Sequence, residues 1–285
     1  MSDSDIRKEV RQAYGKVARE AGSCGCCGPA SEVTQKIATQ LLGYSDKELA
    51  AVPKDANLGL GCGNPTALAS LREGDVVLDL GSGAGIDCFL AADKVGKAGR
   101  VIGVDMTVEM IDRARQNAEE NGYENVEFRL GEIEHLPVAD ASVDRIVSNC
   151  VINLSPDKPQ VFREAYRALR PGGEMLVSDI VLVAELPEDV AADPDSLAAC
   201  ISGAMKKEDY LAAVRAAGFE SVEVLRERPA GARQRREPGT EGGHGDRPQP
   251  RQPKTVEEIR RAAELLASGD LDVFATSVHV RATKG

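Results

Sequence analysis

The feature that most constrains the fold is a regular alternation of short apolar runs and amphipathic stretches after residue 74. The apolar runs have the length of strands, and the stretches between them have the spacing of helices. The expected strands are 76–80, 101–104, 126–130, 143–148 and 174–183, and the expected helices are 84–95, 108–121 and 158–169. Strands joined through helices form crossover units. The sequence therefore predicts an α/β fold with a doubly wound, mainly parallel sheet that is covered on both faces.

An amphipathic helix is expected at the N-terminal end. In residues 4–20, Ile6, Val10 and Tyr14 lie one helical turn apart and form a single apolar stripe. A cysteine-rich loop follows, and a second short helix is expected over 31–42. This part of the chain is predicted to be a helical cap that bears cysteines.

The C-terminal part is expected to add two strands and an unstructured insertion. The pattern favours a helix at 207–217, a strand at 221–225 and a last strand at 277–282, which brings the sheet to seven strands. Residues 228–253 contain five Pro, five Gly and six Arg but no large apolar residue, which is typical of disorder. The predicted divisions are the cap (1–70), the core (71–183), a segment with Cys200, a helix and a strand (184–227), the insertion (228–253) and a C-terminal helix and strand (254–285).

The first expected strand runs directly into a glycine-rich loop, GSGAG at residues 81–85. Glycines allow a backbone to approach a ligand closely, and the N-terminus of the next helix offers free N–H groups. A dinucleotide-binding loop would place its third glycine at position 86, where this chain has Ile86. Asp105 ends the second strand, where a carboxylate can accept both ribose hydroxyls. The spacing G-x-G-x-G therefore weakens the prediction of a dinucleotide-binding loop.

Three of the seven cysteines stand where they could meet at one edge of the sheet. Cys150 follows the fourth strand, Cys62 precedes the sheet in GLGCGNP, and Cys200 follows the fifth strand. Ligands of doubly wound sheets bind outside the carboxyl ends of the strands, so Cys150 is expected to face the cofactor. Three converging thiolates would suit a soft, three-coordinate centre. Cys88, in the middle of the first core helix, is expected to be a small buried apolar residue.

The strand and loop around DLGSGAG resemble the first motif of class I S-adenosylmethionine-dependent methyltransferases, D-x-G-x-G-x-G. The resemblance implies a Rossmann-like core, with S-adenosylmethionine as methyl donor. It also implies that the ribose is held at Asp105 and the adenine near Glu132 and Ile133. The residues expected to contact the cofactor are Asp79, Gly81, Ser82, Gly83, Gly85, Asp105, Met106, Glu132, Ile133 and Asn149.

Longer motifs narrow the resemblance to arsenite methyltransferases. These motifs are GCGNP, DLGSGAGIDCFLAA, GVDMTVEMI, GEIEHLPV and SNCVINLSPDK, and the similarity covers nearly all of residues 5–227. It implies that Cys62, Cys150 and Cys200 bind trivalent arsenic, supplied as arsenite or its thiol conjugates, with Cys150 closest to the methyl group. It further implies that Cys24, Cys26 or Cys27 supports redox turnover, with thioredoxin or glutathione as external reductant.

Two alternatives remain open from the sequence. A methyltransferase of a small organic molecule, such as a quinone precursor, would share the glycine loop but would need a general base rather than three cysteines. A non-catalytic protein that binds a metalloid or zinc could use the CGCC cluster, although that cluster lacks a second C-x-x-C partner. Such a scaffold would have no need for a carboxylate at the ribose position.

Composition limits the partners. With 35 Lys and Arg against 46 Asp and Glu, the net charge of −11 disfavours binding to nucleic acid or to an anionic membrane surface. No apolar run approaches the ~20 residues that span a bilayer, and residues 1–20 show no apolar signal-peptide core. The odd number of cysteines agrees with thiols in a reducing compartment. We expect a cytoplasmic protein without nucleic-acid or membrane partners.

Overall fold

The computed structural model describes residues 2–20, 43–61, 63–186, 203–229 and 274–285. Its helices are α1 (Asp3–Glu20), α3 (Asp46–Ala51), α4 (Pro65–Leu68), α5 (Ile86–Val95), α6 (Val108–Glu120), α7 (Lys158–Ala168) and α10 (Lys207–Ala216), with short 3-10 helices at Lys54–Ala56 and Ile152–Leu154. Its strands are β1 (Val76–Leu80), β2 (Arg100–Asp105), β3 (Val126–Leu130), β4 (Val143–Asn149), β5 (Leu169–Leu182), β6 (Ser221–Pro229) and β7 (Ala275–Thr283). None of the helices in these ranges is long and apolar enough to cross a membrane.

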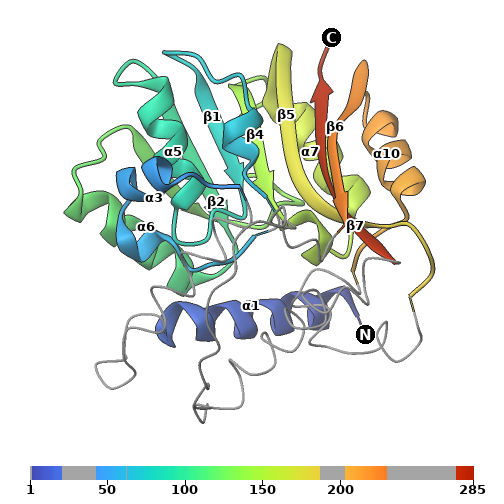
Figure 1. The fold of residues 1–285 in the computed structure, drawn as a ribbon, viewed down its shortest axis with the longest axis horizontal. Coiled ribbons are helices and arrows are strands. Elements are labelled where there is room, and N and C mark those ends of the chain that lie inside the picture. Colours follow the sequence, from blue (N-terminus) through green and yellow to red (C-terminus); the bar gives the residue numbers. More distant parts are fainter. Residues whose placement is uncertain (1, 21–42, 62, 187–202, 230–273) are drawn as a thin grey trace, which may run out of the picture.

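The seven strands form one sheet in the order β3-β2-β1-β4-β5-β7-β6 (Figure 1). The pairs from β3 to β5 are all parallel, whereas β7 runs antiparallel to both β5 and β6. The strand order reverses at β1, which lies between β2 and β4, so the crevice at a switch point opens beside the glycine loop. The predicted doubly wound, mainly parallel α/β fold is confirmed.

The end of β6 corrects one expected boundary. The insertion was predicted to begin at 228, but Arg228 and Pro229 still pair with Ser277 and Thr276 of β7. β6 is the edge strand of the sheet, where a proline costs no ladder hydrogen bond because its nitrogen side can face away from the partner. Composition alone therefore placed the start of the insertion two residues too early, and the rest of the insertion lies outside the described residues.

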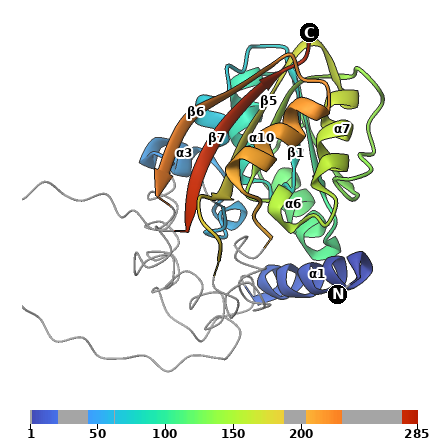
Figure 2. The same ribbon diagram turned by 90° about the vertical axis from the view of Figure 1, so that its right-hand side faces the viewer.

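Each face of the sheet buries its own apolar cluster. In β1, Val77 packs with α5 and α6 on one face, whereas Leu78 packs with α7 and α10 on the other. Both side chains are fully buried because successive side chains of a central strand point to opposite faces. Figure 2 shows α7 and α10 together on the second of these faces. The two clusters hold the carboxyl ends of the parallel strands at one edge.

Helix α1 lies across that edge, below the sheet in Figure 1. Its predicted apolar stripe of Ile6, Val10 and Tyr14 packs into a third cluster, which includes Cys150. At the other end of the helix, the Arg113 guanidinium donates to the carbonyl of residue 18 at 3.0 Å, and Arg19 pairs with Glu109. The cap helix therefore covers the region where the sequence places the site.

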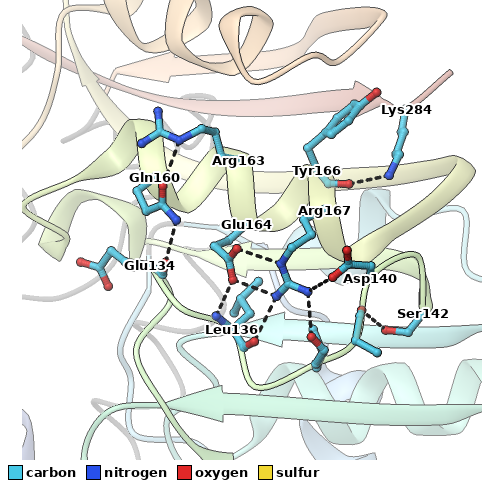
Figure 3. A network of polar contacts seen from close by, with 12 residues as sticks. Glu134, Leu136, Asp140, Ser142, Gln160, Arg163, Glu164, Tyr166, Arg167 and Lys284 are labelled. Carbon is cyan, nitrogen blue, oxygen red and sulfur yellow. Dashed lines mark hydrogen bonds and ion pairs between the residues drawn. The ribbon is translucent and has the colours of Figure 1, made fainter.

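A polar network on α7 fixes the connection between β3 and β4 (Figure 3). The guanidinium of Arg167 donates to the carbonyls of Leu136 and Val138 at 3.1 and 2.9 Å, and it pairs with Asp140 at 2.7 Å. The Glu164 carboxylate accepts the Leu136 amide at 2.8 Å, and Arg167 holds the pKa of that carboxyl below its usual value. The network fixes residues 136–140 of this connection against α7.

A buried carboxylate on β5 makes stability depend on pH. Burial raises the pKa of Asp179 to about 7, although the Ile180 amide and the nearby Lys158 oppose the rise. Because the folded state holds this proton up to a higher pH than the unfolded chain, the free energy of unfolding falls as pH rises from about 4 to about 7 and then levels off. The Asp179→Asn variant should lose this part of the pH dependence, at most about 4 kcal/mol for a shift of about three units.

Urea unfolding of the wild type and of Asp179→Asn at pH 5 and pH 8 measures this contribution. The wild type should lose more stability between the two values than the variant does. An equal loss in both proteins would show that Asp179 does not titrate in this range.

Candidate active site

A cavity of about 240 Å³ lies at the carboxyl edge of the sheet, under α1. It is bounded by the ends of β1, β2 and β4, by the segment 56–61 and by the start of the β3–β4 connection. Of the residues that the sequence predicts as site residues, those lining it are Asp79, Gly81, Ser82, Gly83, Asp105, Met106, Ile133, Asn149 and Cys150. The fold thus brings the glycine loop, Asp105, which the sequence predicts to bind ribose, and one predicted arsenic ligand to one cavity.

The start of the glycine loop (residues 81–85) is hydrogen-bonded to the neighbouring strand β2. The amides of Gly81 and Ser82 both donate to the Val104 carbonyl, at 2.8 and 3.0 Å. Gly81 has φ +68, and a Cβ there would lie 2.3 Å from the Val151 side chain. A side chain at position 81 would therefore be strained and would collide, which explains the glycine directly after β1.

Asp105 anchors the second half of the loop. Its carboxylate accepts the Gly83 amide at 3.0 Å and the Thr107 amide at 2.8 Å. Burial raises the pKa of Asp105, while the amides of Thr107 and Gly83 oppose the rise by stabilising the charged form. The carboxylate lines the cavity, and each of its oxygens keeps lone pairs for a ligand hydroxyl.

Two further buried carboxylates line the cavity beside Asp105. Burial raises the pKa of Asp87 to about 6, opposed by hydrogen bonds from Asn149, Tyr44 and Thr66. Burial, and then the charge of Asp87, raise the pKa of Asp79 well above its usual value. A cationic ligand in this cavity would favour the charged forms of these buried carboxyl groups and so offset the effect of their burial.

Cys88 has a more specific place than the sequence predicted. Its side chain is fully buried, as expected, but its thiol also donates to the Asp79 carboxylate at 3.2 Å. Burial, followed by the charge of Asp79, raises the pKa of the Cys88 thiol well above its usual value. Cys88 therefore stays a neutral thiol that satisfies a buried acid.

Cys150 occupies an unusual backbone conformation. It has φ +61, a region that costs a non-glycine residue about 1–2 kcal/mol. Its amide donates to the Ser178 carbonyl at 2.8 Å, which fixes this conformation against β5. The side chain is only 5% exposed, lines the cavity and is disulfide-bonded in this structure. Backbone strain of this kind is typical of functional positions.

A buried network next to Cys150 joins Asn149, which the sequence predicted as a site residue, to Tyr44 and Asp87, which sequence analysis missed. The Asp87 carboxylate accepts the Tyr44 hydroxyl at 2.9 Å and the Asn149 amide group at 3.1 Å. The same Asn149 nitrogen donates to the Gly63 carbonyl at 2.8 Å. An acid inside the apolar run IDCFLAA is the one signal for Asp87 that the sequence offered. The segment around Cys62 is thereby joined to the end of β4.

Gly63 fits its place only because it has no side chain. A Cβ at this position would lie 2.0 Å from the Ser178 Oγ and 2.6 Å from the His279 Cε1. We expect Gly63→Ala to destabilise the protein by about 1–3 kcal/mol through overpacking and to shift the neighbouring segment. Thermal unfolding should reveal the loss of stability.

Gly15→Ala provides the comparison for this variant. A Cβ at Gly15 in α1 would meet only the end of the flexible Glu109 side chain, at 3.0 Å, and alanine is a better helix former than glycine. This variant should keep or gain stability. If Gly63→Ala were equally stable, the tight fit against Ser178 and His279 would not matter.

The remaining predicted site residues lie elsewhere. Gly85 precedes α5 and faces Phe89, while Glu132 pairs with Arg7 and Arg11 of α1, at 3.4 and 3.5 Å. The cysteines outside the described residues are Cys24, Cys26, Cys27, Cys62 and Cys200. In the parts of the chain that the structure describes, no group of three His, Cys, Asp or Glu side chains could hold a metal ion.

Comparisons with known proteins agree with this architecture. A family model for a methyltransferase domain matches residues 71–218, just over half of the chain. An arsenite methyltransferase from Halobacterium salinarum is 51% identical over 232 residues, which cover 77% of this chain and 59% of that protein. The arsenite methyltransferase of Homo sapiens is 35% identical over 231 residues, with the same two coverages. The chain thus spans about 59% of the length of these curated relatives.

A solved structure extends the similarity to nearly the whole chain. The arsenic(III) S-adenosylmethionine methyltransferase from Chlamydomonas reinhardtii is 31% identical, with a TM-score of 0.59. The match covers 90% of this chain and 74% of that one. With the methyltransferase domain and a strand order that places the glycine loop at the switch point, the chain belongs to the arsenite methyltransferase family of S-adenosylmethionine-dependent methyltransferases.

Proposed function

We propose that this protein transfers the methyl group of S-adenosylmethionine to trivalent arsenic bound by Cys62, Cys150 and Cys200. The observation that carries the proposal is the position of Cys150, which lines the same cavity as the glycine loop and Asp105. A soft nucleophile held at Cys150 would thus lie beside the methyl donor. The arsenite methyltransferases among the relatives support the choice of arsenic as acceptor.

The cavity suits S-adenosylmethionine by shape and by charge. Gly81 and Gly83 leave room for the cofactor's amino-acid part, and Asp105 would accept the ribose hydroxyls. When bound, the cofactor supplies an electrophilic methyl group on a sulfonium. Burial raises the pKa values of Asp79, Asp87 and Asp105, and a sulfonium beside them would favour their charged forms, so this interaction would favour the cofactor over its product, which lacks the sulfonium charge.

The arsenic substrate would be held by sulfur. Each cysteine thiol that displaces a hydroxyl from arsenite forms one As–S bond and releases one water, so three thiols release three waters. The arsenic keeps its lone pair, which is the nucleophile. Thiolates are the ligands that soft centres such as trivalent arsenic prefer. Arsenic carries no proton in either step, so neither ligand exchange nor methyl transfer needs a general base to remove one.

Support for Cys62 as a ligand comes from its described neighbours. The carbonyl of Gly63 accepts the Asn149 amide group at 2.8 Å, and a Cβ on Gly61 would lie 2.9 Å from that same group. Asn149 directly precedes Cys150. Cys200 and the redox cysteines Cys24, Cys26 and Cys27 lie outside the described residues, and their roles rest on the sequence resemblance.

A thiol reductant is part of the proposal. Because Cys150 is disulfide-bonded in this structure, that bond must be reduced by thiol–disulfide exchange before Cys150 can bind arsenic. Thioredoxin or glutathione would supply the two electrons and the thiol protons. Activity should therefore depend on added reductant.

Incubation with methyl-labelled S-adenosylmethionine, arsenite and reductant tests the function. The proposal expects labelled methylarsenicals, formed only when both arsenite and reductant are present. A labelled organic product that forms without arsenite would instead support a methyltransferase of a small organic molecule. No transfer at all, with metalloid or zinc still bound, would support a non-catalytic binding protein.

A further inference from the structure

Tyr44 is buried beside the candidate site but does not line the cavity. Its hydroxyl donates to the Asp87 carboxylate, 2.9 and 3.0 Å from the two oxygens. The same hydroxyl oxygen accepts the Asn149 amide group at 2.9 Å. Tyr44 therefore bridges two residues that do line the cavity while remaining out of reach of any ligand in it.

Asn149 is the residue through which Tyr44 can act on the site. Three oxygens lie within 3.1 Å of its amide nitrogen, and they belong to Tyr44, Asp87 and Gly63. The next residue, Cys150, has φ +61, and its backbone amide donates a hydrogen bond to the Ser178 carbonyl. The Asn149 side chain and the Cys150 amide thus anchor two adjacent residues of the backbone from which the Cys150 thiol projects.

The segment on the other side of Asn149 has little freedom. Gly63 lies so close to Ser178 and His279 that a Cβ would collide with both side chains. The Ser178 side chain is fully buried and the His279 side chain is 6% exposed, so neither can swing into solvent without exposing buried surface. A change in the Asn149 amide would therefore be passed to Gly63 and Cys150 rather than absorbed by the segment.

From these contacts we propose that Tyr44 is a positioning residue. Acting through Asn149, it would set the relative placement of Cys150 and of the glycines on either side of Cys62, and so the affinity for arsenic. This inference rests on the proposed function. It assigns to Tyr44 an effect on the arsenic substrate that is larger than its effect on the cofactor.

Tyr44→Phe removes only the hydroxyl that makes the bridge. Losing one partner of a buried hydrogen bond of this kind corresponds to about a tenfold change in an equilibrium constant. We expect the dissociation constant of arsenite for the fully reduced protein to rise about tenfold, as measured by isothermal titration calorimetry. The affinity for S-adenosylhomocysteine should change less than about threefold, because Asp87 keeps its hydrogen bonds from Asn149 and Thr66.

Tyr210→Phe is the matched control. Tyr210 is also a buried tyrosine whose hydroxyl donates to a buried aspartate, Asp179, at 3.3 Å, but it packs on α7 through Phe162. Both variants should lose similar amounts of thermal stability, which removes stability as an explanation. Only Tyr44→Phe should weaken arsenite binding and raise the KM for arsenite.

The possible results distinguish a failure of the positioning role of Tyr44 from a failure of the proposed function. Arsenite binding that is unchanged in Tyr44→Phe, or weakened equally in both variants, would overturn the positioning role while the proposed function stands. A larger loss of S-adenosylhomocysteine affinity than of arsenite affinity would also overturn it. A wild type that binds no arsenite after full reduction would remove the proposed function and this inference with it.

Discussion

Replacing Cys150 with serine is expected to lower the rate of arsenite methylation more than about a hundredfold, because a misplaced nucleophile loses at least that much. A serine hydroxyl is a hard, protonated oxygen ligand, so arsenic would lose one of three sulfur ligands and its placement toward the methyl group. The hydroxyl matches the thiol closely in shape, and the side chain is only 5% exposed. Initial rates with labelled S-adenosylmethionine measure the effect.

Cys88→Ser is the control for this variant. Cys88 is the other cysteine in the described ranges; it is buried, and it donates to Asp79 at 3.2 Å, a bond that a serine hydroxyl can replace. It should reduce the rate only a few fold. If Cys150→Ser kept nearly full activity under reducing conditions, arsenic would not be methylated at Cys150.

The second large effect is expected for Asp105→Asn, which should bind S-adenosylmethionine more weakly. The Asp105 carboxylate accepts hydrogen bonds from the Gly83 and Thr107 amides and would accept two more from the ribose hydroxyls. The substitution removes the negative charge of this acceptor. Hydrogen bonds to a charged group contribute about 1.5–3 kcal/mol, so the KM for S-adenosylmethionine should rise about ten- to a hundredfold. Steady-state kinetics with varied cofactor, together with calorimetry of S-adenosylhomocysteine binding, would measure it.

Asp105→Asn should weaken cofactor binding and spare arsenite binding, whereas Cys150→Ser should weaken arsenite binding. Arsenite binding to reduced Asp105→Asn should be unchanged, because Asp105 contacts the glycine loop, where the proposal places the cofactor. Asp112→Asn, which removes an exposed carboxylate from the neighbouring α6, should leave both ligands unaffected. Equal cofactor affinity in Asp105→Asn and the wild type would contradict the ribose-binding role.

Most of the fold could be predicted from local sequence patterns. Fully buried strands such as β1 and β2 appear as continuous apolar runs, and each is followed by a helix, so the parallel sheet follows from chirality and crossover rules. Antiparallel pairing of β7 between β5 and β6 could not be predicted in this way. This pairing depends on which strands β7 contacts after a long intervening segment, and a local sequence pattern does not specify the partners of a strand.

In the candidate site too, the residues of local motifs could be predicted, whereas contacts between distant segments could not. Gly81 and Gly83 could be predicted as cavity residues because they belong to a short motif that directly follows β1, and Asp105 because it ends the next strand, β2. Tyr44, Asp87 and Asn149 form a network between segments as far as 105 residues apart, so its hydrogen bonds exist only in three dimensions. The positive φ of Cys150 was likewise invisible, because the β5 carbonyl that stabilises it lies in a distant strand.

Arsenic K-edge X-ray absorption on the reduced protein with one equivalent of arsenite tests the central claim most directly. The account predicts an arsenic atom with three sulfur neighbours and no oxygen neighbour in the wild type. In Cys150→Ser it predicts that one of the three sulfur neighbours is lost. Oxygen-only coordination in the wild type, or a sulfur count that Cys150→Ser leaves unchanged, would contradict an arsenic site built on Cys150 at the cofactor cavity.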